Sequence, residues 1–284
     1  MSFSRLPSLL SIPMPIYKEF KRRNDFDSRI IPPFASDDPR YFGFVILLRV
    51  ALNQINPPKG RDRFEVPDSM DIPRACFRWN DASWAHFKQE FLRVALATWD
   101  GAFLLRQPSS YAGLVWPDRG DRRYDALCGL FIKLVDESEA HAILNVPRMV
   151  DPHASFASDS TLLDSNDVDG TLHGDLKAGL QWKQHAAAHE VGHLLGLHHV
   201  ANSSSACRSS FANCYGSNVA ERINIMGTGD MLSFDDAKPW RERIEWHTGA
   251  DSDQWEVDWA SDEAALRGSE SLADIPKKAS GARR

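Results

Sequence analysis

The spacing of apolar side chains along the chain predicts both helices and strands. Between residues 84 and 99 they recur every three or four positions, which is typical of an amphipathic helix, and Asn80 and Asp81 before it are both suitable N-caps. Short apolar runs bounded by Gly, Pro or Asp predict strands at residues 76–79, 103–105, 114–116, 130–135 and 140–146. This mixture of elements predicts a fold of the α+β class.

Two more helices are expected in the second half of the chain. The first covers about residues 180–195, and the second begins after Ser233, where caps and acidic side chains precede a proline that a first helical turn tolerates, Pro239. Between the strands and these helices, residues 158–170 are rich in aspartate. They lack the alternating ligands and terminal glutamate of an EF-hand calcium loop, so we expect a solvated loop.

The pattern divides the chain into three parts. Residues 1–70 are irregular and rich in proline, so we expect an N-terminal extension or a possible pro-segment, with a buried strand or helix at residues 41–52. Residues 71–255 carry the regular pattern of a folded domain. Residues 256–284 are polar and basic at their end, which predicts a disordered tail.

Composition narrows the classes of function. The chain has 284 residues, 43% of them hydrophobic, which suffices for one sizeable core. Its formal net charge of −6 argues against binding to nucleic acid. No apolar run reaches the roughly 18 residues of a transmembrane helix, so no transmembrane segment is expected. Three prolines interrupt the apolar stretch of residues 6–16, so a signal peptide is not clear.

Four cysteines are too few for a disulfide scaffold. Cys207 and Cys214 bracket a short polar loop, and they are either a disulfide or two free thiols. Cys76 is expected to be buried in a strand, and Cys128 carries no specific expectation. The cysteines therefore decide neither the compartment nor the oligomeric state.

The most informative segment is the run HEVGHLLGLHH at residues 189–199, which contains four of the ten histidines. His189 and His193 are four residues apart, so both imidazoles project from one face of the helix predicted at about residues 180–195 and can bind one ion. Glu190 is rotated by about 100° from His189, which lets it act on a metal-activated water without being a ligand. These residue types at this spacing predict one catalytic Zn²⁺ ion.

A third protein ligand is needed for a catalytic zinc site, and the residues after His193 provide one. Gly196 can adopt the left-handed conformation that ends a helix, so the chain can turn back and present His199 to the same ion. His198 is treated as a flanking residue. The other histidines are expected to be ordinary surface or core residues: His86, His141, His153, His173, His185 and His247.

The run matches H-E-x-x-H-x-x-G-x-x-H and resembles the metzincin zinc metallopeptidases. Asn224-Ile225-Met226-Gly227 resembles the methionine turn of that family, in which the methionine supports the site from below and is not a ligand. The resemblance covers about residues 71–250. It implies a metzincin-like mixed sheet with an active-site helix, a backing helix and a small C-terminal subdomain. It also implies an antiparallel edge strand that binds extended substrate, best matched by residues 140–146.

The resemblance implies a secreted zinc-dependent endopeptidase that hydrolyses peptide or protein substrates with Glu190 as general base. Two departures leave the subfamily unassigned: Val200 follows the third histidine, and Thr228 stands where some subfamilies have a tyrosine that stabilises the oxyanion. Two alternatives stay open. One is an inactive zinc-containing binding or scaffold protein, and the other is a hydrolase of non-peptide amides.

Overall fold

The computed structural model describes residues 26–33, 40–115, 123–151, 156–175 and 179–269 of the chain. The strands are β1 (Asp27–Ile31), β2 (Phe42–Ile55), β3 (Arg63–Pro67), β4 (Pro73–Phe77), β5 (Phe103–Arg106), β6 (Ala126–Leu134), β7 (Ala142–Met149), β8 (Thr171–Asp175), β9 (Leu180–Gln184), β10 (Leu232–Ser233), β11 (Glu256–Trp259) and β12 (Gly268–Ser269). The helices are α1 (Asp81–Trp99), α2 (Ala186–Leu194), α3 (Ser205–Ser209), α4 (Val219–Ile223), α5 (Lys238–Thr248) and α6 (Asp262–Arg267). Short 3-10 turns are η3 (Glu137–Glu139), η4 (Phe211–Tyr215), η5 (Phe234–Ala237) and η6 (Ser252–Gln254). The mixed α+β class is as predicted.

An eight-stranded mixed sheet forms the body of the molecule, in the order β11-β5-β6-β2-β7-β4-β3, with β1 paired to β2. β2 runs parallel to both β6 and β7. Its side chains alternate: Phe44, Ile46 and Leu48 are fully buried, whereas Val45 and Leu47 are partly exposed on the other face. This period of two places the core on one face of the sheet.

Helices α1, α2 and α5 supply side chains to the same hydrophobic cluster as the buried face of β2. α1 matches the predicted helix, and Asn80 is its N-cap, because the Asn80 Oδ1 accepts the Ser83 N–H at 2.8 Å. At the other end of α1, the buried Trp99 Nε1 donates to the Ala188 carbonyl of α2 at 2.9 Å. α1 is therefore the backing helix against which α2 is placed.

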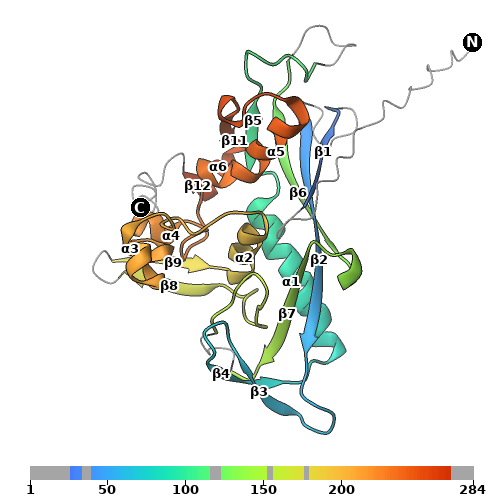
Figure 1. Ribbon diagram of the computed structural model, residues 1–284, viewed down its shortest axis with the longest axis vertical. Coiled ribbons are helices and arrows are strands. Elements are labelled where there is room, and N and C mark those ends of the chain that lie inside the picture. The colour runs from blue at the N-terminus through green and yellow to red at the C-terminus, as the bar shows by residue number, and fades with distance from the viewer. Residues whose placement is uncertain (1–25, 34–39, 116–122, 152–155, 176–178, 270–284) are drawn as a thin grey trace, which may run out of the picture.

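In Figure 1 the sheet runs along the long axis, and a side lobe projects from α2. We use the name side lobe for the β8–β9 hairpin with α3 and α4. The helix expected at residues 180–195 begins only at Ala186, because the segment before it forms β9. Alternate residues of β9 are exposed and partly buried in its pairing with β8, the period of a strand and not of a helix.

The expected boundary near residue 70 passes through the main sheet. β2 has neighbours on both sides, and β1 and β3 are paired as well, so these three strands belong to the main sheet. The expected tail also contributes to the fold, since β11 pairs with β5 and α6 follows it. Residues 1–25 and 270–284 lie outside the described residues.

The expectation of an antiparallel edge strand at residues 140–146 is wrong. β7 is parallel to β2, and its other side is engaged by β4 and by residues 161–163. Asn145 donates its N–H to the Thr161 carbonyl at 2.9 Å and accepts the Leu163 N–H at 3.0 Å. Within the part of the chain that the structure describes, no helix has the length and apolar character needed to cross a bilayer.

Candidate metal centre and its cleft

Helix α2 and the turn after it bring the three predicted ligands together. The ligating nitrogens of His189, His193 and His199 all lie within 4.8 Å of one another. His189 and His193 meet because they are one helical turn apart. His199 reaches them because Gly196 has a φ of +90° and reverses the chain after the helix, as predicted. His198, treated as a flanking residue, is exposed.

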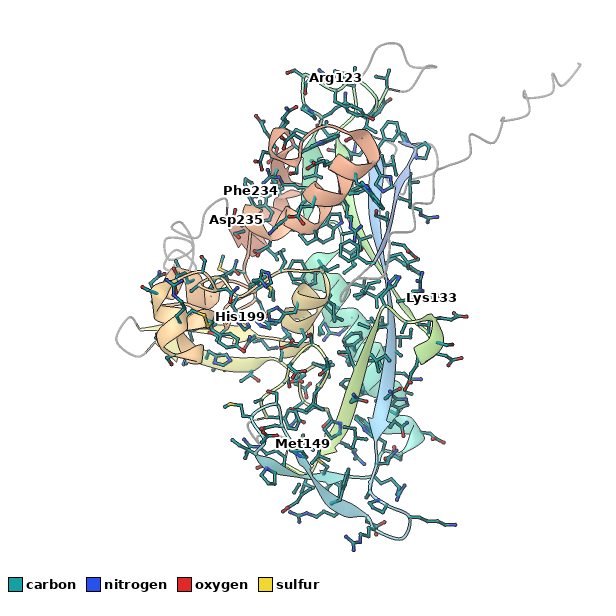
Figure 2. The ribbon with its side chains drawn as sticks, viewed as in Figure 1. Arg123, Lys133, Met149, His199, Phe234 and Asp235 are labelled. Carbon is teal, nitrogen blue, oxygen red and sulfur yellow. A yellow bond between two sulfur atoms is a disulfide. The ribbon has the colours of Figure 1, made fainter. Side chains whose placement is uncertain are left out.

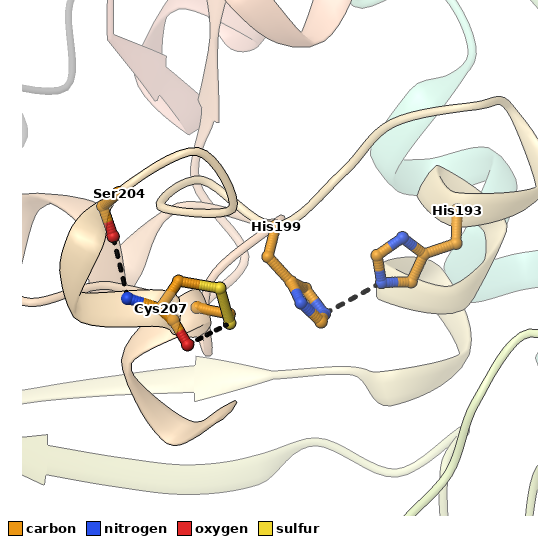
Figure 3. Close-up of a disulfide and its surroundings, with 5 residues drawn as sticks. His193, His199, Ser204 and Cys207 are labelled. Atoms are coloured by element: carbon orange, nitrogen blue, oxygen red, sulfur yellow. Dashed lines mark hydrogen bonds between the residues drawn. A yellow bond between two sulfur atoms is a disulfide. The ribbon is translucent and has the colours of Figure 1, made fainter. Parts of the chain in front are cut away.

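Backbone carbonyls set the tautomers of two of these histidines. His189 Nδ1–H donates to the Ile225 carbonyl at 2.6 Å, and His193 Nδ1–H donates to the Leu197 carbonyl at 2.8 Å. A carbonyl oxygen only accepts, so each Nδ1 carries the proton and each Nε2 keeps its lone pair. The His193 and His199 Nε2 atoms are 3.0 Å apart (Figure 3).

Burial keeps these imidazoles neutral. Burial, together with the neighbouring His193, lowers the pKa of His189 to about 3 and that of His199 to about 4. The His189 Nε2 is buried and has no hydrogen-bond partner among the described residues. A buried polar atom without a partner costs free energy unless something binds it. Three neutral nitrogens facing one point are the donor set that Zn²⁺ prefers, so the residues fit the ion.

Glu190 lies on α2 beside the histidines and lines the same cleft. Only 4% of its surface is exposed, and its Oε2 has no partner among the described residues. Burial raises the pKa of Glu190 well above its ordinary value, and the negative charges of Asp167 and Asp159 raise it further. A carboxyl with a raised pKa is suited to accept a proton and to hold it.

The methionine turn packs directly under α2. Met226 is 1% exposed, and a Cβ at Gly192 would lie 2.4 Å from its Sδ, so Met226 contacts the helix between the two ligands. The turn is fixed by Asn224, whose Oδ1 accepts the Met226 N–H at 2.7 Å and whose Nδ2 donates to Asp236 at 2.9 Å. The Met226 carbonyl accepts the Val200 N–H at 3.2 Å, which ties the third ligand's segment to the same turn.

Cys207 and Cys214, whose state the sequence left open, form a disulfide in the structure. It closes the loop that follows His199, and in the view of Figure 3 His199 lies between the disulfide and His193. Figure 2 places His199 where α2 meets the side lobe. Cys76 is fully buried in β4, as expected, and Cys128 is buried in β6.

Sequence reasoning missed Tyr215, which lies directly after the disulfide. Its ring centroid is 4.0 Å from that of His199 and 5.7 Å from that of His189. Burial raises the pKa of Tyr215 to about 12, and Glu190 and Asp159 contribute to that shift. The only sequence signal was its position next to Cys214. Thr228 lines the cleft as well, but its Oγ1 donates to the Arg222 carbonyl at 3.1 Å.

A cleft of about 1010 Å³ opens over the histidines. Its walls come from α2 and the turn after it, from residues 156–160 and from the side lobe. Among the described residues that line it, Glu190 and Asp159 are the acidic ones and none is Lys or Arg. The cleft therefore combines the histidine cluster with acidic side chains.

The loop at residues 158–170 is not the solvated loop that its composition predicts. Asp164 is 2% exposed and Asp167 is 8% exposed, because the loop packs behind α2. The Asp167 carbonyl accepts the Ala187 N–H at 3.0 Å, and its carboxylate accepts the Ser158 hydroxyl at 2.6 Å. Burial raises the pKa of Asp164 to about 8 and that of Asp167 to about 6.

Comparisons with known protein families, with curated proteins and with solved structures found no match to this chain. The functional conclusion therefore depends on the motif and on the geometry of the cleft.

Proposed function

We propose that the chain is a zinc-dependent endopeptidase of metzincin type, without an assigned subfamily. The observation that carries this proposal is the convergence of three neutral histidines in one cleft with a buried Glu190, whose Oε2 has no hydrogen-bond partner among the described residues. A site that only holds a metal needs the histidines and does not need the glutamate. A buried carboxyl without a partner is costly, so its presence supports a role in a reaction.

His189, His193 and His199 would hold the ion. When bound, Zn²⁺ supplies Lewis acidity, which lowers the pKa of water and polarises a carbonyl. Glu190 accepts a proton from the attacking water and delivers it to the amine that leaves when the peptide C–N bond breaks. The Ile225 and Leu197 carbonyls hold two of the imidazoles in orientation, and Met226 supports the helix from below.

The size of the cleft supports a polymeric substrate. Pockets for small molecules have volumes of about 300–1,000 Å³, and this cleft, at about 1010 Å³, lies at the upper end of that range while remaining open. An open cleft accommodates a segment of a longer chain on both sides of the reacting bond. Peptide or protein substrates therefore fit better than a small amide.

The test is zinc analysis joined to cleavage of a peptide library by wild type, by Glu190→Gln and by Glu242→Gln. Glu242 is an exposed residue of α5 and serves as the matched control. We expect wild type and Glu242→Gln to bind one zinc ion and to cleave peptides, and a chelator to abolish cleavage. Glu190→Gln should bind zinc but lose at least about 10³-fold in kcat, because it removes the proton acceptor.

Three results would contradict the proposal. Zinc-loaded wild type that is inert on the library would favour a binding or scaffold protein. Cleavage of small amides alone would favour a non-peptide amidase. Peptide cleavage that persists with the chelator and in Glu190→Gln would rule out the metal-dependent mechanism.

A further inference from the structure

The ring of Tyr215 covers the metal centre from the side of the loop. It contacts two of the three ligand rings, those of His199 and His189, and it lines the same cleft as Glu190. Tyr215 is the last residue of η4, which connects α3 to α4 in the side lobe, and is not part of α2. The chain therefore brings the ring of a tyrosine to the centre from outside the zinc motif.

Three constraints fix the backbone of Tyr215 and of the residue before it. The preceding residue, Cys214, is joined to Cys207 by the disulfide, and its carbonyl accepts the Ala201 N–H at 3.1 Å. A Cβ at Gly227 would lie 2.8 Å from the Tyr215 carbonyl oxygen, so this backbone packs directly on the methionine turn. A side chain held in this way is preorganised, and preorganisation is what makes a hydrogen-bond donor effective in catalysis.

Attack of water on a peptide carbonyl places negative charge on the carbonyl oxygen, and a fixed donor beside that oxygen lowers the barrier. Three other polar side chains that line the cleft donate to protein acceptors. The Thr228 hydroxyl donates to Arg222, the Gln184 amide donates to the Gly227 carbonyl at 3.3 Å, and the Ser158 hydroxyl donates to Asp167. A phenol O–H is a donor at neutral pH.

We propose that the Tyr215 hydroxyl donates a hydrogen bond to the oxyanion that forms on the substrate carbonyl. The phenol proton stays on Tyr215 throughout, so the residue forms no covalent bond and exchanges no electrons. This inference rests on the proposed endopeptidase function. It assigns to Tyr215 a role that Thr228 does not fill, because the Thr228 hydroxyl donates to the Arg222 carbonyl.

The test compares Tyr215→Phe with Tyr111→Phe, whose ring packs on Trp255 outside the cleft. Zinc content and melting temperature are measured first, and both variants should match wild type. Tyr215→Phe should then lower kcat by about 10²–10³-fold with little change in KM, the loss measured when one oxyanion donor is removed elsewhere. Tyr111→Phe should leave both constants unchanged.

A binding measurement gives a readout that does not depend on turnover. A phosphinic peptide of the best-cleaved sequence has a tetrahedral, charged centre that mimics the oxyanion. Calorimetry should show its affinity weakened by about 10²–10³-fold in Tyr215→Phe. The uncleaved parent peptide should bind equally to Glu190→Gln and to the double variant Glu190→Gln/Tyr215→Phe.

Each other outcome overturns the inference. If wild type and Tyr215→Phe bind the phosphinic peptide with equal affinity, the proposed hydrogen bond to the oxyanion is ruled out. Loss of zinc in Tyr215→Phe would show that the phenol holds the metal instead. If wild type cleaves peptides and Tyr215→Phe matches it, this inference fails alone; if zinc-loaded wild type cleaves nothing, the proposed function fails and this inference fails with it.

Discussion

The metal centre has two halves that are held in different ways. The helix half, His189, Glu190 and His193, lies on α2 and is packed against α1 and the methionine turn. The loop half, His199 and Tyr215, is more exposed and is positioned by the left-handed Gly196 and the disulfide. Helix geometry alone therefore sets the spacing in one half, whereas the other half depends on contacts between residues that are distant along the chain.

The largest expected effects come from removing a zinc ligand. The two halves then differ in how much each substitution destabilises the metal-free protein. His189→Ala and His199→Ala should both abolish zinc binding and lower peptide cleavage by at least about 10³-fold, because each removes a ligand. In metal-free protein only His189→Ala should destabilise the fold, by about 2–4 kcal/mol. It leaves a buried cavity and a buried Ile225 carbonyl without its donor.

Urea unfolding in the presence of a chelator measures that difference, with wild type as reference. His199→Ala should stay within about 1 kcal/mol of wild type, because its ring is only partly buried. Equal destabilisation by both substitutions would show that the loop half is as much a part of the core as the helix half.

The next effect concerns the disulfide, which belongs to the loop half alone. Cys207→Ser/Cys214→Ser should lower kcat by about tenfold and weaken zinc binding less than His199→Ala does, because Tyr215 and His199 lose a constraint while the ligands stay present. The loss of stability should be at most about 3 kcal/mol, since the closed loop is short. Activity and zinc affinity are measured in parallel.

Cys128→Ser is the matched control, because Cys128 is a buried free thiol in β6, away from the cleft. It tests whether any cysteine substitution has the same effect. If Cys128→Ser lowers kcat as much as the disulfide variant does for the same loss of stability, the loop half does not depend on the disulfide.

The contrast between the halves also explains what the sequence could predict. The i,i+4 spacing of His189 and His193 and the role of Gly196 follow from local geometry, and the structure places them as expected. Met226 was found through a family motif, and its contact with Gly192 appears only in the structure. Tyr215 has no local signal beyond its position next to Cys214, because its approach to His199 is set by the disulfide and by packing on the methionine turn.

The sequence likewise predicts the local features of the fold but not the long-range pairing of its strands. The helix α1 and its cap follow from apolar spacing and from Asn80, which are local features. The place of β2 at the centre of the sheet is not local, because it depends on pairing with β6 and β7, which lie far along the chain. The sequence predicts a buried strand or helix at residues 41–52, but its pairing with β6 and β7 places it in the main sheet and not in an N-terminal extension.

The smallest expected effect on zinc binding and cleavage accompanies a pH dependence of stability that arises behind the helix half. Asp164 and Asp167 have pKa values of about 8 and about 6, raised by burial from an ordinary 3.8. Below pH 6.5 the lowered pKa values of His189 and His199 make stability rise with pH. Between pH 4 and 8 Asp164 and Asp167 hold more protons in the folded chain than in the unfolded chain, so their contribution to stability should fall as pH rises through that window. Above the higher pKa this contribution becomes constant.

Urea unfolding of chelator-treated protein at pH 5 and pH 8 measures this change, and the chelator removes metal binding as a cause. Asp164→Asn should remove the Asp164 contribution from the profile, because the amide does not titrate, and should retain the local Asn166 N–H contact through its side-chain oxygen. The exposed Asp253→Asn serves as control and should leave the profile of wild type unchanged. A profile that Asp164→Asn does not alter would place the pH dependence elsewhere. The helix half would then be insensitive to the acidic loop behind it, and the two halves would differ in packing alone.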